Sequence, residues 1–254
     1  MHGQRHCSNV ISLRGSEPLI RKLTSAGLLA DRDIKVLERS GVRTIAGKQD
    51  IYSEGDSMGD ILFLREGWAF RYRLLGDGRR QVVNFLVPGD LIGPFTPTAK
   101  QFAATLTGSS VWRVSRREIA DSNRECPAFS AAVEALIAAE YDLLAERTVS
   151  LGRRNAKERM SHFLLEFFER LQRVGLVSDN SFELPLTQEM MGDALGLSVV
   201  HVNRTLKALR KDGLATVAFG RATIHDPEAL SLVADTEDGS HLPHEQVTEV
   251  TALH

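Results

Sequence analysis

The chain has 254 residues, of which 43% are hydrophobic and 25% are charged, and its formal net charge is −2. This composition is that of an ordinary globular protein and excludes wholesale disorder, and the length suffices for one large domain or two modest ones. A net charge near zero does not decide whether the protein binds nucleic acid, because only the docking face of such a protein must be basic.

The two cysteines, Cys7 and Cys126, are too few and too far apart for a disulfide framework or a closed zinc site. A reducing cytoplasm is therefore the expected location. The N-terminus lacks the long apolar core of a secretory signal, and no apolar run is long enough to span a bilayer, so no membrane association is expected.

The first third of the chain predicts a short helical region followed by many strands. A polar arm over residues 1–17 precedes a helical pattern from Pro18 to Ser40, which breaks at Gly27. From Val42 to Ser115, short apolar runs are separated by Gly-Asp and Asp-Gly turns. Strands at this spacing, with no helix between them, predict an antiparallel sandwich or barrel.

One hairpin inside this region can be placed from its pattern. Residues 68–75 read WAFRYRLL, in which large apolar side chains recur at every second position, as in a strand. The sequence Gly-Asp-Gly at 76–78 predicts a tight turn into a second strand over residues 81–87.

A long helix is predicted from Ala128 to Leu151, because this segment is rich in Ala, Leu and Glu and contains neither Gly nor Pro. Its apolar stripe consists of Val133, Leu136, Ile137, Leu143 and Leu144. Glu140 and Arg147 interrupt the stripe. The stripe predicts a dimer seam, and a helix packed only on its own barrel is the alternative.

The next helix carries apolar residues at helical spacing and ends near Gly175. These residues form a core face and are Met160, Phe163, Leu164, Phe167, Phe168 and Leu171. A basic cluster precedes the helix at Arg153, Arg154, Lys157 and Arg159. The residues after about Asp235 are polar and acidic and predict a flexible tail.

The most informative stretch runs from Thr187 to Gly213 and predicts a helix-turn-helix. Thr187 is a suitable N-cap for a short helix, and Ser198 is one for a second helix. Between them, Gly196 permits the tight turn, and Gly192 lies where a larger side chain would push the crossing helices apart.

The outward face of the second helix carries residue types that recognise DNA. Arg204 can pair with guanine O6 and N7, Asn203 suits an adenine edge, and Lys207 can meet a phosphate. A following hairpin over residues 214–224 predicts a wing with Arg221 at its tip. The predicted DNA-binding residues are Thr187, Ser198, Val199, Val200, His201, Asn203, Arg204, Lys207 and Arg221.

These features, in this order, resemble the CRP/FNR superfamily of bacterial regulators over about residues 18 to 230. The resemblance rests on IYSEGD at 51–56, LVPGDLIG at 86–93, the long helix, and the helix-turn-helix over 186–214, which is similar to the FixK/FNR-like branches.

The resemblance implies an α+β fold: a cupin-like antiparallel β jelly roll, a long dimerisation helix and a C-terminal winged helix-turn-helix. The corresponding bounds are 18–125 for the barrel sensor domain, 126–151 for the dimerisation helix, 152–230 for the DNA-binding domain and 231–254 for the tail. It also implies a homodimer that binds a pseudo-palindromic DNA site and works with RNA polymerase. Arg204 matches the family's guanine-reading arginine, whereas Val200 stands where the family usually has a base-contacting glutamate.

The sensory residues depart from the well-known branches of the family. Pro94 follows Gly93 where cyclic-AMP-binding members have a glutamate, and no Arg-Ser pair occurs between Phe95 and Val111. A buried phosphate without a cationic partner is costly, so dependence on cyclic AMP is not expected. Two cysteines cannot supply an iron–sulfur cluster, and the barrel contains no histidine for a haem. No cofactor is predicted, and the effector is unknown.

Two alternatives come from other functional classes. A cupin-like metal enzyme would need clustered His and carboxylate ligands, but residues 42–115 contain no histidine, and no catalytic or metal site is predicted. A ligand-binding protein whose helical domain no longer binds DNA is the other alternative, and the cations of the second helix argue against it.

Overall fold

The computed structural model describes residues 17–25, 41–117 and 127–234. The expected N-terminal arm, the helical pattern beyond residue 25, both cysteines and the tail after residue 234 lie outside these ranges. Helix α1 (Glu17–Ser25) confirms the first part of the helical pattern before Gly27.

The predicted barrel consists of two four-stranded antiparallel sheets, which confirms the jelly roll. One sheet has the order β1-β8-β3-β6 and the other the order β2-β7-β4-β5. The strands are β1 (Gly41–Ile45), β2 (Asp50–Tyr52), β3 (Asp60–Glu66), β4 (Ala69–Leu74), β5 (Arg80–Leu86), β6 (Leu91–Gly93), β7 (Phe102–Thr105) and β8 (Ser109–Ser115).

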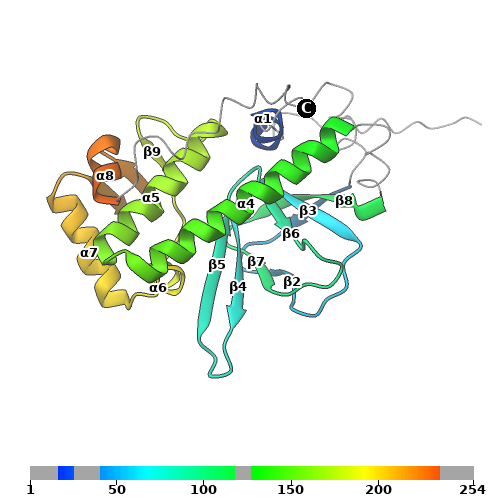
Figure 1. Ribbon diagram of the computed structural model, residues 1–254, viewed down its shortest axis with the longest axis horizontal. Helices are drawn as coiled ribbons and strands as arrows, with labels where there is room; N and C mark the ends of the chain where they lie inside the picture. Colours follow the sequence, from blue (N-terminus) through cyan, green and yellow to red (C-terminus); the bar gives the residue numbers. More distant parts are fainter. Residues whose placement is uncertain (1–16, 26–40, 118–126, 235–254) are drawn as a thin grey trace, which may run out of the picture.

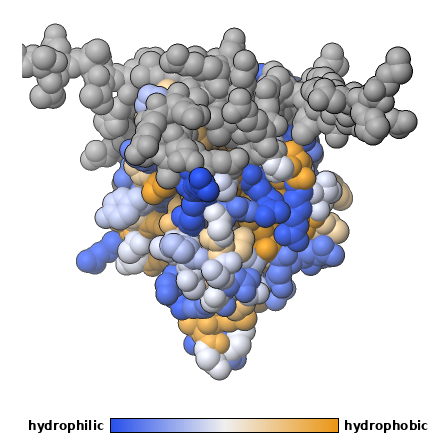
Figure 2. All heavy atoms as spheres, turned by 90° about the vertical axis from the view of Figure 1, so that its right-hand side faces the viewer, coloured by the Kyte–Doolittle hydropathy of each residue, from blue (hydrophilic) through white to orange (hydrophobic). Residues whose placement is uncertain are grey.

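The β4–β5 hairpin forms as the Gly-Asp-Gly sequence predicts, and it projects from the barrel (Figure 1). The turn is closed by hydrogen bonds from Leu75 N to Arg79 O, 2.8 Å, and from Gly78 N to Leu75 O, 2.9 Å. In Figure 2 the described surface narrows to a tip with apolar surface near its end. Leu74 and Leu75, which come just before the hairpin turn, are both exposed.

Helix α4 (Pro127–Arg153) runs diagonally across the barrel toward the C-terminal domain (Figure 1). Its apolar residues divide between two faces. Phe129, Val133 and Leu136 are buried on the barrel and on α1. A second row, apolar except for Thr148, is exposed or half-buried at alternating spacings of three and four residues: Ile137, Tyr141, Leu144, Thr148 and Leu151.

The two polar residues that interrupt the predicted stripe of α4 point into the protein. Arg147 donates to Glu166 of α5 (Ala156–Arg173), with Nη2 2.9 Å from Oε1, and to the carbonyl oxygen of Val83, 2.7 Å away. Glu140 pairs with Arg71 inside the barrel. One side of the helix therefore packs on its own barrel, as the alternative interpretation predicted. The other side, which carries the exposed row, is an open seam that is available to a second copy of the chain.

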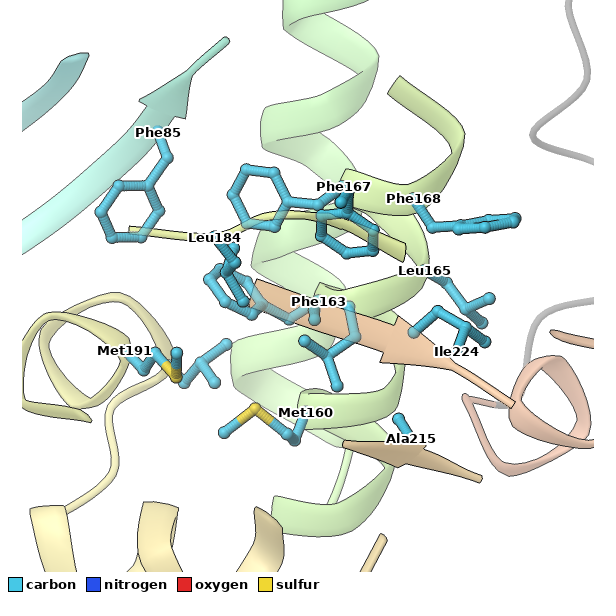
Figure 3. Packing of buried hydrophobic residues seen from close by; sticks show 14 of the residues in the cluster. Phe85, Met160, Phe163, Leu165, Phe167, Phe168, Leu184, Met191, Ala215 and Ile224 are labelled. Atoms are coloured by element: carbon cyan, nitrogen blue, oxygen red, sulfur yellow. The ribbon is translucent and has the colours of Figure 1, made fainter. Parts of the chain in front are cut away.

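The stripe of α5 forms the centre of the largest core, as predicted. Its aromatic side chains meet Phe85 of β5 on one side and the C-terminal strands on the other (Figure 3). The ring of Phe163 lies 5.9 Å from that of Phe85 and 4.9 Å from that of Phe167, both edge to face. The barrel and the C-terminal domain therefore share one continuous core.

The C-terminal domain also contains helices α6 (Gln188–Leu195) and α7 (Val199–Lys211) and a three-stranded sheet. The predicted hairpin is formed by β10 (Ala215–Ala218) and β11 (Arg221–Ile224), and β9 (Ser181–Glu183), which the sequence analysis missed, pairs with β11. Helix α8 (Pro227–Ala234) extends beyond residue 230, because Leu230 and Ala234 are buried against the core. Residues 231–234 are thus part of the packed domain and not of the predicted tail.

Candidate nucleic-acid interface

The two helices α6 and α7 form the predicted helix-turn-helix, with both caps as expected. The Thr187 hydroxyl accepts from Met190 N at the start of α6, and the Ser198 hydroxyl accepts from His201 N at the start of α7. Gly196 ends α6 with φ of +63°, the left-handed conformation that glycine adopts without a steric penalty.

Gly192 is required by the close approach of the turn to α6. A Cβ atom at this position would lie 2.5 Å from the carbonyl oxygen of Leu197, and the next contact is Val202 of α7. Any side chain would therefore push the turn away from α6 and change the angle at which α7 is presented. This agrees with the sequence-based prediction for Gly192.

Helix α7 is the basic element of the domain, since it contains four cations and no carboxylate. Val202, Thr205 and Leu209 are buried and fix one side of the helix against the core. The exposed side presents Val199, Val200, His201, Arg204 and Lys207 together. Neither Arg204 nor Lys207 forms an ion pair with any residue in the described ranges, so both charges face solvent.

Some of the predicted DNA-binding side chains also have structural roles. Asn203 is half-buried and donates from Nδ2 to Gln188 Oε1 of α6, 3.3 Å away. The His201 ring nitrogen Nδ1 lies 3.0 Å from the Ser198 hydroxyl. Thr187 and Ser198 accept hydrogen bonds as helix caps, so both hydroxyl groups also fix the starts of their helices.

Arg221 is separated from the tip of the wing by the turn residues. It is the first residue of β11 and lies opposite Ala218 and Glu183 in the sheet. The tip itself is the exposed Phe219, which the sequence analysis did not select although Gly220 marks a turn there. Arg221 also lines a cavity of about 640 Å³ between the barrel and the C-terminal domain.

The basic cluster before α5 is largely engaged within the protein. Arg154 pairs with Glu146 at 2.6 Å, and Lys157 pairs with Asp212 at 2.7 Å. Arg159 donates to the carbonyl oxygens of Leu195 and Arg154. These contacts join α4, α5 and the helix-turn-helix, so the cluster positions α7 and is not part of the exposed basic face.

The described residues form neither a metal cluster nor a membrane-spanning helix. Within residues 17–25, 41–117 and 127–234, no group of three His, Cys, Asp or Glu side chains is arranged to hold a metal ion. Within the same ranges, no helix is both long and apolar enough to cross a membrane.

Two family descriptions match the chain. Residues 42–122 match the family described as a cyclic nucleotide-binding domain, which corresponds to the barrel. Residues 158–233 match the family described as a Crp-like helix-turn-helix domain, which includes α6 and α7.

Several characterised regulators are similar over most of their length. The nitrogen fixation regulation protein FixK of Rhizobium meliloti is 32% identical over 74% of this chain and 85% of its own. FixK of Bradyrhizobium diazoefficiens is 29% identical over 86% and 93%, respectively. The transcriptional activator FnrL of Cereibacter sphaeroides is 30% identical over 76% and 80%.

A solved structure supports the same assignment. FixK2 from Bradyrhizobium japonicum superposes with a TM-score of 0.70 at 25% identity and covers 78% of this chain and 98% of its own. These relatives are regulators, and they do not favour either of the alternatives from other functional classes. The jelly roll, the long helix and the winged helix-turn-helix thus occur in the order and over the extent found in these proteins, and the chain belongs to the CRP/FNR family of transcription regulators, in the branch that contains FixK.

Proposed function

We propose that this regulator binds a pseudo-palindromic DNA site as a two-fold dimer, with one α7 helix in the major groove of each half-site. The observation that carries this proposal is the solvent-facing row on α7, where Arg204 and Lys207 are exposed and have no ion-pair partner among the described residues. Helices of this kind read base edges from their N-terminal half and phosphates from the remainder.

The roles of the site residues follow from their positions. Arg204 is proposed to read a guanine, and Val199 and Val200 are proposed to make apolar contacts to thymine methyl groups. The N-terminus of α7, with Ser198 and His201, suits a phosphate because its first backbone N–H groups have no partner within the helix. Thr187 and Arg221 are proposed to contact the DNA backbone. Asn203 is proposed to contact a base, for which its side chain must give up the hydrogen bond to Gln188.

The dimer is proposed to form through the open seam of α4. Its exposed row repeats at spacings of three and four residues, the pattern with which two parallel helices pack. A dimer built on this helix presents two α7 helices to successive turns of DNA.

The experiment is selection of bound DNA from a random pool, with sedimentation of the free protein at micromolar concentration. A pseudo-palindromic consensus and a dimer are expected. A pool without sequence enrichment, or a strict monomer that binds a palindrome tightly, would contradict the proposal.

RNA polymerase is the proposed partner at the bound site, and transcription from a promoter carrying the selected site tests it. The access to chromosomal DNA that this function requires places the protein in the cytoplasm.

Cyclic AMP is not expected to control binding. The buried guanidinium of the barrel, that of Arg71, is already paired with Glu140, and Pro94 follows Gly93 where a sugar contact would be needed. Calorimetric titration with cyclic AMP should show no micromolar binding. Binding at that level, combined with a change in DNA affinity, would contradict this expectation.

A further inference from the structure

Arg71 is a fully buried arginine in the middle of β4, with 2% of its surface exposed. Placing a charged guanidinium out of contact with water is costly unless an anion and hydrogen-bond acceptors surround it. The sequence predicts a strand here but gives no reason for an arginine inside the barrel. The groups around Arg71 therefore indicate which kind of ligand the interior of the barrel can bind.

Among the described residues, a single carboxylate neutralises the buried guanidinium of Arg71. Glu140 of α4 pairs with Arg71 Nη2 and has a side chain that is 12% exposed. Asn84 lies directly opposite Arg71 in the β4–β5 register and donates from Nδ2 to both carboxylate oxygens, at 2.9 and 3.1 Å. The carboxylate is thus held by donors from two strands, although it belongs to the helix that packs on them.

The other described side chains beside Arg71 supply no negative charge that would compete with Glu140. The guanidinium lies over the ring of Phe95, with Cζ 5.0 Å from the ring centre. Tyr52 contributes no second negative charge: burial raises the pKa of its phenol to about 12, and the hydroxyl donates to Ile92 O at 3.0 Å. Arg71 Nε and Asn84 Oδ1 are buried and have no hydrogen-bond partner among the described residues, so Glu140 neutralises the charge of Arg71 without satisfying every polar atom around it.

We propose that Arg71 and Asn84 form a carboxylate-binding site inside the barrel and that the chain fills this site with its own Glu140. A residue of the long helix takes the place that a diffusible anion would otherwise occupy, and the barrel needs no small-molecule acid to neutralise Arg71. The next residue, Tyr141, points outward on the proposed dimer seam. The internal carboxylate therefore holds the seam in a fixed rotation relative to the barrel. This inference concerns the barrel and stands independently of how α7 reads DNA.

The test is chemical rescue of Glu140→Ala in the full-length protein. The variant leaves Arg71 buried without an anion, and we expect its melting temperature to fall by about 10 °C. Formate or acetate at constant ionic strength, with chloride as the exchanged ion, should restore stability in a saturable manner. Acetamide has nearly the shape of acetate without its charge and should not restore it. The parent protein should show no saturable response to either anion.

Matched variants separate this site from general effects. Glu54→Ala removes the partner of Arg73 on the same strand, an exposed pair at 3.1 Å, and should neither destabilise strongly nor respond to formate. Arg71→Met combined with Glu140→Met removes both charges and should fold without any formate response. If Glu140→Ala can be purified folded only when formate is present, that is the expected rescue in another form.

Four outcomes would overturn the proposal. These are a Glu140→Ala variant as stable as the parent, equal rescue by acetamide, and a saturable response of the parent to small carboxylates. The fourth is a Glu140→Ala variant that stays unfolded with and without formate while the double-methionine variant folds. The melting experiment contains no DNA, so its failure is distinguishable from a failure of the proposed DNA-binding function.

Discussion

The guanidinium of Arg80 on β5 contacts the carboxylate of Asp193 on α6, with Nε 2.8 Å and Nη2 2.6 Å from the same oxygen, Oδ2. This ion pair joins the projecting hairpin of the barrel to the first helix of the helix-turn-helix. The side chain of Gln81 adds a weaker contact to the carbonyl oxygen of Ala194, at 3.4 Å. The orientation of the DNA-binding helices is therefore set in part by the barrel.

We expect Asp193→Asn to lower the free energy of unfolding by about 1 kcal/mol at low salt, because the pair is only partly exposed. The difference from the parent should shrink at high salt as the charges are screened. Urea unfolding of the variant and the parent at two salt concentrations measures this difference in stability. Asp77→Asn, which alters an exposed pair with Arg79 at the tip of the same hairpin, is the control and should have no measurable effect. An equal loss at both salt concentrations would contradict the electrostatic explanation.

Arg204→Ala should cost roughly 1–3 kcal/mol per half-site and relax selection at one base pair, because guanine alone offers two acceptors to this side chain in the major groove. Lys207→Ala should weaken all sequences alike and reduce the salt dependence, since a phosphate contact carries no base information. Binding of both variants to a half-site library at fixed salt distinguishes them. An unchanged sequence profile for Arg204→Ala would show that α7 docks differently.

Val200 is 76% exposed at the start of α7 and has no hydrogen-bonding atom in its side chain. We expect weak selection, or a preference for thymine, at the base pair it faces. Val200→Glu introduces an acceptor for cytosine N4 and should shift the preference toward cytosine. The same half-site library measures the shift, and an unchanged preference at every position would place Val200 away from the base edges.

Tyr141→Asp should disrupt the dimer, because the two-fold axis would bring two carboxylates together in an apolar seam. We expect the dimer dissociation constant to rise by at least about tenfold, which corresponds to 1.4 kcal/mol. Sedimentation velocity measures the change. Leu232→Asp is the matched control, because Leu232 on α8 has the same exposed fraction as Tyr141, 73%, but lies outside α4. Dissociation of both variants to the same extent would argue against an α4 seam.

Stability should fall in acid because of two buried carboxylates. Burial alone would raise the pKa of Asp90, but the charges of Arg170 and Lys22 outweigh it and lower the pKa to about 2. Glu166 behaves likewise beside Arg147 and Arg170, and its pKa is also about 2. Both folded-state pKa values lie below those of the unfolded chain, so the stabilisation is complete above about pH 5 and is lost as the pH falls toward 2.

Arg170→Met tests this network, because Arg170 is shared by both carboxylates. We expect a loss of about 3–5 kcal/mol at neutral pH, since two buried charges then lack their common partner. The loss should shrink as the pH falls, because both carboxyl groups then titrate at a higher pKa and are neutralised. Urea unfolding at pH values across this range measures the loss, and Arg173→Met, an exposed position on the same helix, is the control. A pH-independent loss would indicate a packing defect.

The fold and the recognition helix could be predicted because their signals are local. Thr187, Gly192, Gly196 and Ser198 specify the helix-turn-helix within a dozen residues, and each has the role that its chemistry predicts. Strand β9 was missed because three residues are too few to show a periodicity. The inward turn of Glu140 was missed as well, since its partner Arg71 is 69 positions away. The contact of Arg80 with Asp193 spans 113 positions, so no local pattern contains it.

The shared aromatic core has a consequence for how the chain can be divided. Phe85 of the barrel and Phe163 and Phe167 of α5 are all buried, and their rings contact one another. Cutting the chain between the two family regions would leave an uncovered aromatic face on both pieces, and such faces aggregate. The barrel and the DNA-binding domain match two separate families, but they should unfold in one cooperative transition. Neither should be obtained as a soluble, folded fragment when it is expressed alone.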